Sequence, residues 1–163
     1  MDKSRFGRKD RLAEQKRHDT YQHKRKWTSP SICKDCGALY KDGRWQWGEI
    51  HEQVEETICP ACQRIKDDYP AGRVFLSGNF FNDHYEELVN MIRNEERLEK
   101  GEHPMERIMH IRQDPDNPGQ TLITTTGIHL ARRIGDKLYK AYEGDLDYHY
   151  EQDEKYMMVT WTR

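Results

Sequence analysis

Four cysteines carry the clearest chemistry in this chain of 163 residues. They form two Cys-x-x-Cys pairs, Cys33 with Cys36 and Cys59 with Cys62. Two thiolates at this spacing on a tight turn can both reach one metal ion at about 2.3 Å. Two such pairs complete a tetrahedron and leave no open coordination position. The sequence therefore predicts one structural Zn²⁺ ion and no metal-based catalysis.

The distance between the two cysteine pairs leaves other interpretations open. Residues 37–58 separate the pairs, a gap slightly longer than the commonest spacing of zinc sites. A redox-active pair or four unrelated thiols are the alternatives, and the ligand set does not by itself separate zinc from iron. We expect zinc, because a small metal ribbon requires an ion that does not change its redox state.

A basic segment precedes the cysteines. Residues 1–27 contain ten Lys and Arg against four Asp and Glu, a net charge of +6, whereas the remaining 17 basic and 25 acidic residues give −8. Cations at this density neutralise phosphates and release counterions, so we predict contact with RNA in preference to DNA. A solvated tail that aids solubility is the alternative. The predicted contacts in this segment are Arg5, Arg8, Lys9, Arg11, Lys16, Arg17, Lys24, Arg25, Lys26 and Trp27.

A hairpin is predicted between the two cysteine pairs. Asp42 and Gly43 suit a tight turn, because such turns require positive φ angles. Trp45 and Trp47 follow at a spacing of two and are expected to face the same side, close to Arg44. These three residues join the predicted RNA contacts. The two tryptophans have two open roles, covering the ribbon's small core or stacking on RNA bases.

The second half of the chain predicts an α+β domain. Strands are expected at residues 73–77, 106–113, 120–125, 146–150 and 156–162, with helices after the first and third of them. The first six elements match a ferredoxin-like βαββαβ order, with one extra C-terminal strand. The predicted organisation is a disordered basic arm at 1–31, a zinc ribbon at 32–68 and the ferredoxin-like domain at 73–163.

Local signals predict details of the two helices. Asp83 with Glu86 has capping-box spacing at the first helix, and Thr126 is expected to cap the second. The acids between Glu95 and Glu99 are interpreted as an exposed helix face. The second helix has an apolar stripe opposite a basic face, which we interpret as solvated, with a phosphate-binding stripe as the alternative. The stripe is Leu130, Ala131, Ile134, Leu138 and Ala141, and the basic face is His129, Arg132, Arg133, Lys137 and Lys140.

Several classes of protein are disfavoured by the sequence. It shows no pairing of a nucleophile with a base and no Gly-rich phosphate loop, so we expect neither an enzyme nor a small-molecule substrate. It has no apolar run of about 18 residues, so no membrane span is expected. The charged N-terminus lacks an apolar signal core, which predicts a cytoplasmic protein.

Three stretches resemble a known family. They are Cys33-Lys-Asp-Cys-Gly37, Cys59-Pro-Ala-Cys62, and Thr126-Gly-Ile-His-Leu-Ala-Arg-Arg-Ile-Gly135 running on through Lys140-Ala-Tyr-Glu-Gly144. Over residues 32–163 the chain resembles a small bacterial zinc-ribbon family that looks related to the N-terminal part of the archaeal and eukaryotic large-ribosomal-subunit export adaptor. The resemblance implies binding to the ribosome, through ribosomal RNA and with ribosomal proteins as further partners.

The resulting hypothesis is a non-catalytic, ribosome-associated zinc protein. It would act on translation through ribosome hibernation, or on ribosome biogenesis through subunit maturation. Two rivals remain open at this point. A DNA-binding transcriptional regulator would use the same basic segment on duplex DNA. A protein-interaction adaptor would dock a basic partner on the acidic remainder of the chain.

Overall fold

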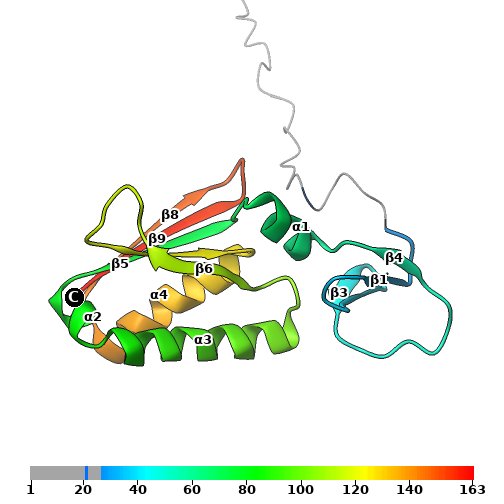
Figure 1. Cartoon of the computed structure of the whole chain (residues 1–163), viewed down its shortest axis with the longest axis horizontal. Coiled ribbons are helices and arrows are strands. Elements are labelled where there is room, and N and C mark those ends of the chain that lie inside the picture. The colour runs from blue at the N-terminus through cyan, green and yellow to red at the C-terminus, as the bar shows by residue number, and fades with distance from the viewer. Residues whose placement is uncertain (1–20, 22–26) are drawn as a thin grey trace, which may run out of the picture.

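The computed structural model describes residue 21 and residues 27–163 (Figure 1). The described residues form a mixed α/β structure with two sheets and four helices. Most of the predicted basic arm lies outside the described residues. Nine of the predicted RNA contacts lie outside them as well: Arg5, Arg8, Lys9, Arg11, Lys16, Arg17, Lys24, Arg25 and Lys26.

The first sheet and one helix make up the ribbon. Its elements are β1 (Ser31–Cys33), β2 (Leu39–Lys41), β3 (Arg44–Gln46), β4 (Glu55–Thr57) and α1 (Pro60–Asp67), with strand order β3-β2-β1-β4. Asp42 and Gly43 both have positive φ, 52° and 80°, so the predicted tight hairpin turn is confirmed. Strand β4, which pairs in parallel with β1, and helix α1 were not predicted. Each is too short to stand out from its sequence pattern.

The second sheet and three helices make up the α+β domain. Its elements are β5 (Gly72–Ser77), α2 (Asn79–Asp83), α3 (Tyr85–Glu102), β6 (Ile108–Gln113), β7 (Thr121–Thr125), α4 (Ile128–Tyr142), β8 (Asp145–Glu151) and β9 (Tyr156–Thr162). The strand order is β6-β7-β5-β9-β8. Apart from the short α2, the chain order agrees with the predicted βαββαββ.

The extra strand lies inside the sheet. In a ferredoxin-like sheet the strand after the second helix pairs with the first strand, but here β9 pairs with β5 in parallel and β8 forms the edge. Burial explains this order. Strand β9 buries Met157, Val159 and Trp161 at alternate positions, whereas β8 is exposed along most of its length. The more apolar strand therefore occupies the more central place.

The core lies between the second sheet and two helices. Helices α3 and α4 cover the same face of the sheet, and the ribbon lies at one end of it (Figure 1). Four members of the predicted α4 stripe are buried, while Ala141 is exposed. The buried core comprises Val74, Leu76, Phe81, Leu88, Ile92, Ile123, Leu130, Ala131, Ile134, Leu138, Met157, Val159 and Trp161.

Two local predictions for α3 are wrong. The capping box at Asp83 does not form, because α2 ends there and His84 precedes α3 without a side-chain cap. Glu95 does not belong to an exposed face, since only 3% of it is exposed. It pairs with Arg133 at 2.7 Å and with Lys137 at 3.6 Å, both on α4. The packing of α4 against α3 supplies the cations that a buried carboxylate requires.

No helix in the described part of the chain is both long enough and apolar enough to cross a membrane.

Gly135 in α4 provides a test of this packing. A Cβ atom at Gly135 would lie 2.7 Å from Val159 Cγ1, whereas one at Gly101 in α3 would meet nothing within 4 Å. We expect Gly135→Ala to lower the free energy of unfolding by about 1–3 kcal/mol through overpacking, although alanine favours helix. Gly101→Ala, the matched control, should raise it by up to about 1 kcal/mol. Urea denaturation measures both values.

The same clash predicts coupling between two sites. Adding Val159→Ala should make room for the new methyl group. The double variant should then be less destabilised than the two single variants predict together. A Gly135→Ala protein that is more stable than the wild type would contradict the close packing of α4 on β9.

Candidate metal centre

The four cysteines come together as the sequence predicts. Their Sγ atoms all lie within 4.8 Å of one another, and three of the residues are buried while Cys36 is partly exposed. Cys33 ends β1, Cys59 is the N-cap of α1 and Cys62 lies in its first turn. Between the first two cysteines the chain turns sharply, and Gly37 completes that turn with φ of 79°. Four converging thiols suit one tetrahedral metal ion, and the group can hold it.

Backbone N–H groups also point at the sulfur atoms. The Cys59 N–H donates to Cys33 Sγ at 3.3 Å, and the Cys62 N–H donates to Cys59 Sγ at 3.3 Å. Pro60, at the first position of α1, removes an N–H that would have no partner in the helix. Hydrogen bonds of this kind stabilise thiolates, which are the form of cysteine that binds a metal.

Two of the thiols lie within hydrogen-bond distance of each other. The pKa of Cys36 is lowered to about 4, mainly by its hydrogen bond with Cys59, whose sulfur lies 3.7 Å away. The pKa of Cys59 is raised by the same contact and by burial. The pKa of Cys62 is raised mainly by burial, which a hydrogen bond from Arg107 opposes. A bound metal ion would take the place of the thiol protons, because metal binding deprotonates cysteine.

Arg107 of the α+β domain reaches the cysteine cluster. Its Nη1 donates to Cys62 Sγ at 3.2 Å, and its Nη2 donates to Cys36 Sγ at 3.0 Å and to Cys59 Sγ at 3.3 Å. The residue is 7% exposed. Burial lowers the pKa of Arg107, but the hydrogen bond to Cys62 and the nearby thiolates raise it overall. Its positive charge offsets part of the negative charge of the thiolates.

The segment before β6 holds Arg107 in place. Its Nε donates to the Pro104 carbonyl at 2.8 Å, and its backbone N–H donates to Thr126 Oγ1 at 2.9 Å. The Thr126 hydroxyl in turn donates to the Met105 carbonyl at 2.6 Å. The prediction that Thr126 caps α4 is therefore wrong, because its side chain is used here. Glu106 replaces it, with Oε2 accepting from the Leu130 N–H at 3.0 Å.

Two further contacts join the ribbon to the α+β domain. Met105 packs against the cysteine cluster. Trp47, just after β3, donates its indole N–H to the Lys100 carbonyl at the end of α3, at 2.6 Å. Trp47 of the ribbon contacts the end of α3, and Arg107 of the α+β domain contacts the cysteine cluster. The two parts are therefore joined at two separate places.

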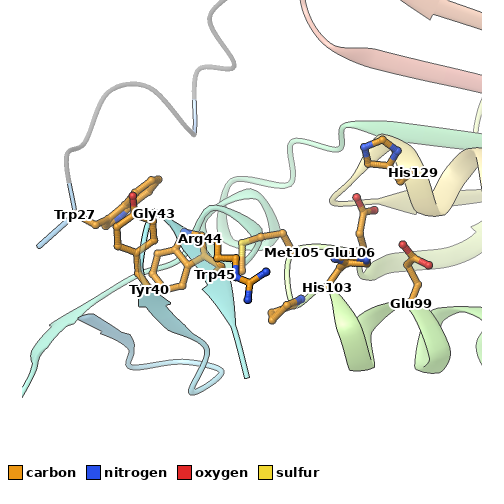
Figure 2. A pocket seen from close by; sticks show the side chains of 11 residues that line it. Trp27, Tyr40, Gly43, Arg44, Trp45, Glu99, His103, Met105, Glu106 and His129 are labelled. Atoms are coloured by element: carbon orange, nitrogen blue, oxygen red, sulfur yellow. The ribbon is translucent and has the colours of Figure 1, made fainter. Parts of the chain in front are cut away.

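Three of the four predicted RNA contacts in the described part of the chain, Trp27, Arg44 and Trp45, gather in one place. Trp27, Tyr40 and Trp45 form an aromatic cluster with ring centroids 5.2–5.4 Å apart. The aromatic cluster and Arg44 line one wall of a groove of about 650 Å³ between the ribbon and the α+β domain (Figure 2). Trp45 also packs against the cysteine cluster, so it serves the ribbon core and the groove together. Trp47 does not line this groove.

Comparisons with protein-family models, with curated proteins and with solved structures found no match to this chain. What the metal centre can do therefore follows from its geometry. Four cysteine ligands leave no position for a substrate, so the centre is suited to holding structure and not to catalysis. Arg107 is the residue of this centre that the sequence pattern does not reveal. It lies 45 residues beyond the nearest cysteine, in no motif.

Metal removal is expected to unfold the ribbon selectively. The ribbon strands have three residues each, and its buried cluster consists largely of the cysteines, whereas the α+β domain has its own apolar core. A chelator should make all four thiols reactive and abolish amide protection in residues 31–67, while β5 and β9 stay protected. Thiol titration and hydrogen exchange measure these changes. Unreactive thiols in metal-free protein would contradict a structural metal.

Arg107 is expected to strengthen metal binding. Arg107→Met should weaken metal affinity about ten- to a hundredfold, because charge and hydrogen bonds to three sulfur atoms are lost. The metal affinity of Arg107→Lys should lie between those of the wild type and Arg107→Met, because lysine keeps the positive charge but not the several donors of the guanidinium. Competition with a chromophoric chelator gives the affinities. Arg112→Met, at an exposed position of β6, is the matched control and should bind metal as the wild type does. Equal affinity in all four proteins would contradict the role of Arg107.

Proposed function

We propose that this protein is a non-catalytic, ribosome-associated zinc protein that binds ribosomal RNA in the cytoplasm. In this proposal it acts in ribosome hibernation or in subunit maturation. One observation carries the proposal. A basic segment of net charge +6 reaches the described structure at Trp27, and Trp27 lies in the wall of an aromatic groove on a metal-binding ribbon.

The cysteine cluster supports a platform function. One zinc ion held by four cysteines would make the ribbon rigid without exposing a reactive metal. The contacts of Arg107 and Trp47 hold the ribbon against the α+β domain. These contacts hold both walls of the groove in place before RNA binds. Less conformational entropy would therefore be lost on binding.

The charge distribution favours the basic segment as the site of phosphate contact. On α4, Arg133 pairs with Glu95 and Glu99, and Lys137 pairs with Glu95. These cations are already neutralised, which supports the interpretation of the α4 basic face as a structural and solvated surface. Phosphates would then meet the basic segment, residues 1–27, while Arg44 would contact RNA from the groove wall.

The aromatic groove favours RNA over duplex DNA. Unpaired bases of RNA loops can leave their stack and pack on aromatic side chains, whereas bases of a duplex cannot. The acidic remainder of the chain, with net charge −8, would suit contact with basic ribosomal proteins.

Sedimentation tests this proposal. A tagged full-length protein in cell lysate should travel with ribosomes or one subunit in a sucrose gradient. Neutralising Lys24, Arg25 and Lys26 to Gln should release it at lower salt and reduce the slope of log K against log salt by about 2. Neutralising Arg93, Arg97 and Lys140 removes the same charge from α3 and α4 and should change neither property. Wild-type protein that stays at the top of the gradient would refute ribosome binding.

Two further measurements separate the rival functions. Competition between ribosomal RNA and duplex DNA of equal length should favour the RNA. A preference for the duplex would support the DNA-binding regulator instead. Partner capture that survives nuclease treatment would support the protein-interaction adaptor.

A further inference from the structure

The groove between the ribbon and the α+β domain has two unlike walls. The first is the aromatic cluster of Trp27, Tyr40 and Trp45. The second includes His103 and Glu106 from the segment before β6 and His129 from the start of α4, with the Glu106 carboxyl group pointing toward His129 (Figure 2). The volume of about 650 Å³ falls within the range of roughly 300–1,000 Å³ usual for ligand sites.

The charges along the groove nearly cancel. Arg44 is positive and Glu106 negative, while the charge of Glu99 is offset by Arg133, whose Nη1 lies 2.8 Å from its carboxylate. A lining of this kind does not attract a phosphate group to its interior. It suits a flat, uncharged heterocycle with polar edges, which is the chemistry of a nucleobase.

Two hydrogen-bond donors in the groove wall find no acceptor in the described part of the chain. The indole N–H groups of Trp27 and Trp45 are buried and find no acceptor among the described residues. A buried donor without a partner costs free energy, so such groups are usually satisfied by water or by a ligand.

Glu106 offers an acceptor on the opposite wall. The residue is 8% exposed, and one of its oxygens, Oε2, accepts from the Leu130 N–H. Its other oxygen accepts no hydrogen bond from the described residues. Burial raises the pKa of Glu106, so the carboxylate would gain from a further donor. An exocyclic amino group is such a donor and projects beyond the ring edge, whereas the only Watson–Crick donor of uracil is its ring N3–H.

We propose that this groove is a subsite for one unpaired nucleobase that bears an exocyclic amino group. The base would pack on the aromatic cluster, and Glu106 would accept a hydrogen bond from its amino group. The strand's phosphates would lie outside the groove, where the basic segment joins it at Trp27. The subsite rests on the RNA-binding function proposed above and adds to it a preference for cytosine, adenine or guanine over uracil.

Binding of two short RNAs tests the subsite. The probes are a fluorescein-labelled decamer of uridine and the same decamer with one central cytidine, and the protein is the full-length, metal-loaded chain. Fluorescence anisotropy should show about tenfold tighter binding of the cytidine decamer, the discrimination expected of one well-placed base contact. Binding should also change the tryptophan fluorescence.

Two groove variants and one control locate the preference. Glu106→Gln should bind both decamers about equally, because the amide presents a donor where the carboxylate accepts. Its carbonyl can still accept from the Leu130 N–H. His103→Ala, at an exposed position, should weaken binding of the cytidine decamer more than that of oligouridine. Glu102→Gln, an exposed carboxylate outside the groove lining, is the control and should keep the full preference. Thermal unfolding of each variant checks its fold.

The possible outcomes separate the subsite from the function beneath it. Equal affinity of the wild type for the two decamers overturns the subsite while leaving RNA binding intact. A preference for the cytidine decamer that persists in both Glu106→Gln and His103→Ala also overturns the subsite and leaves RNA binding intact. Wild-type protein that binds neither decamer and does not sediment with ribosomes overturns the RNA-binding function and the subsite together.

Discussion

The contact between the Arg107 guanidinium and three cysteine sulfur atoms is the interaction on which the arrangement of this protein depends. Clustered thiolates repel one another, and a buried guanidinium without a partner is costly. The guanidinium offsets the repulsion among the thiolates, and the sulfur atoms supply the partners that the buried guanidinium requires. The distances between its nitrogens and the three sulfur atoms are 3.0–3.3 Å. Because the cysteines belong to the ribbon and Arg107 to the α+β domain, the same contact orients the two parts. The groove between them exists as a consequence.

The short segment between α3 and β6 contributes side chains to the groove, to the cysteine cluster and to the cap of α4. His103 lines the groove, Met105 packs on the cysteines, Glu106 caps α4 and Arg107 reaches the sulfur atoms. Side chains of neighbouring residues point in different directions in an irregular segment, so one loop can contact several elements. The Thr126 hydroxyl and backbone anchor this loop to the start of α4. A structural change at the metal centre would therefore shift the start of α4 and the residues that line the groove.

A metal ion in the cysteine cluster and the apolar core would stabilise different parts of the chain. The ribbon, residues 31–67, is too small to hold a core of its own, and its buried cluster is built around the cysteines. The α+β domain instead buries a continuous apolar cluster between its sheet and its helices. The ribbon would therefore respond to metal supply, while the α+β domain would remain folded. Any RNA contact that needs both walls of the groove would then depend on the metal.

The sequence by itself determined the features that depend on neighbours a few residues apart. The cysteine pairs, the turn at Asp42 and Gly43 and the apolar stripe of α4 are of this kind, because spacing and backbone preference act locally. The tertiary structure alone decided that Glu95 is buried, that β9 lies inside the sheet and that Arg107 reaches the cysteines. Their partners are distant in the chain, so no local pattern records them. The cysteine cluster was therefore predictable, whereas Arg107, which joins it to the α+β domain, was not.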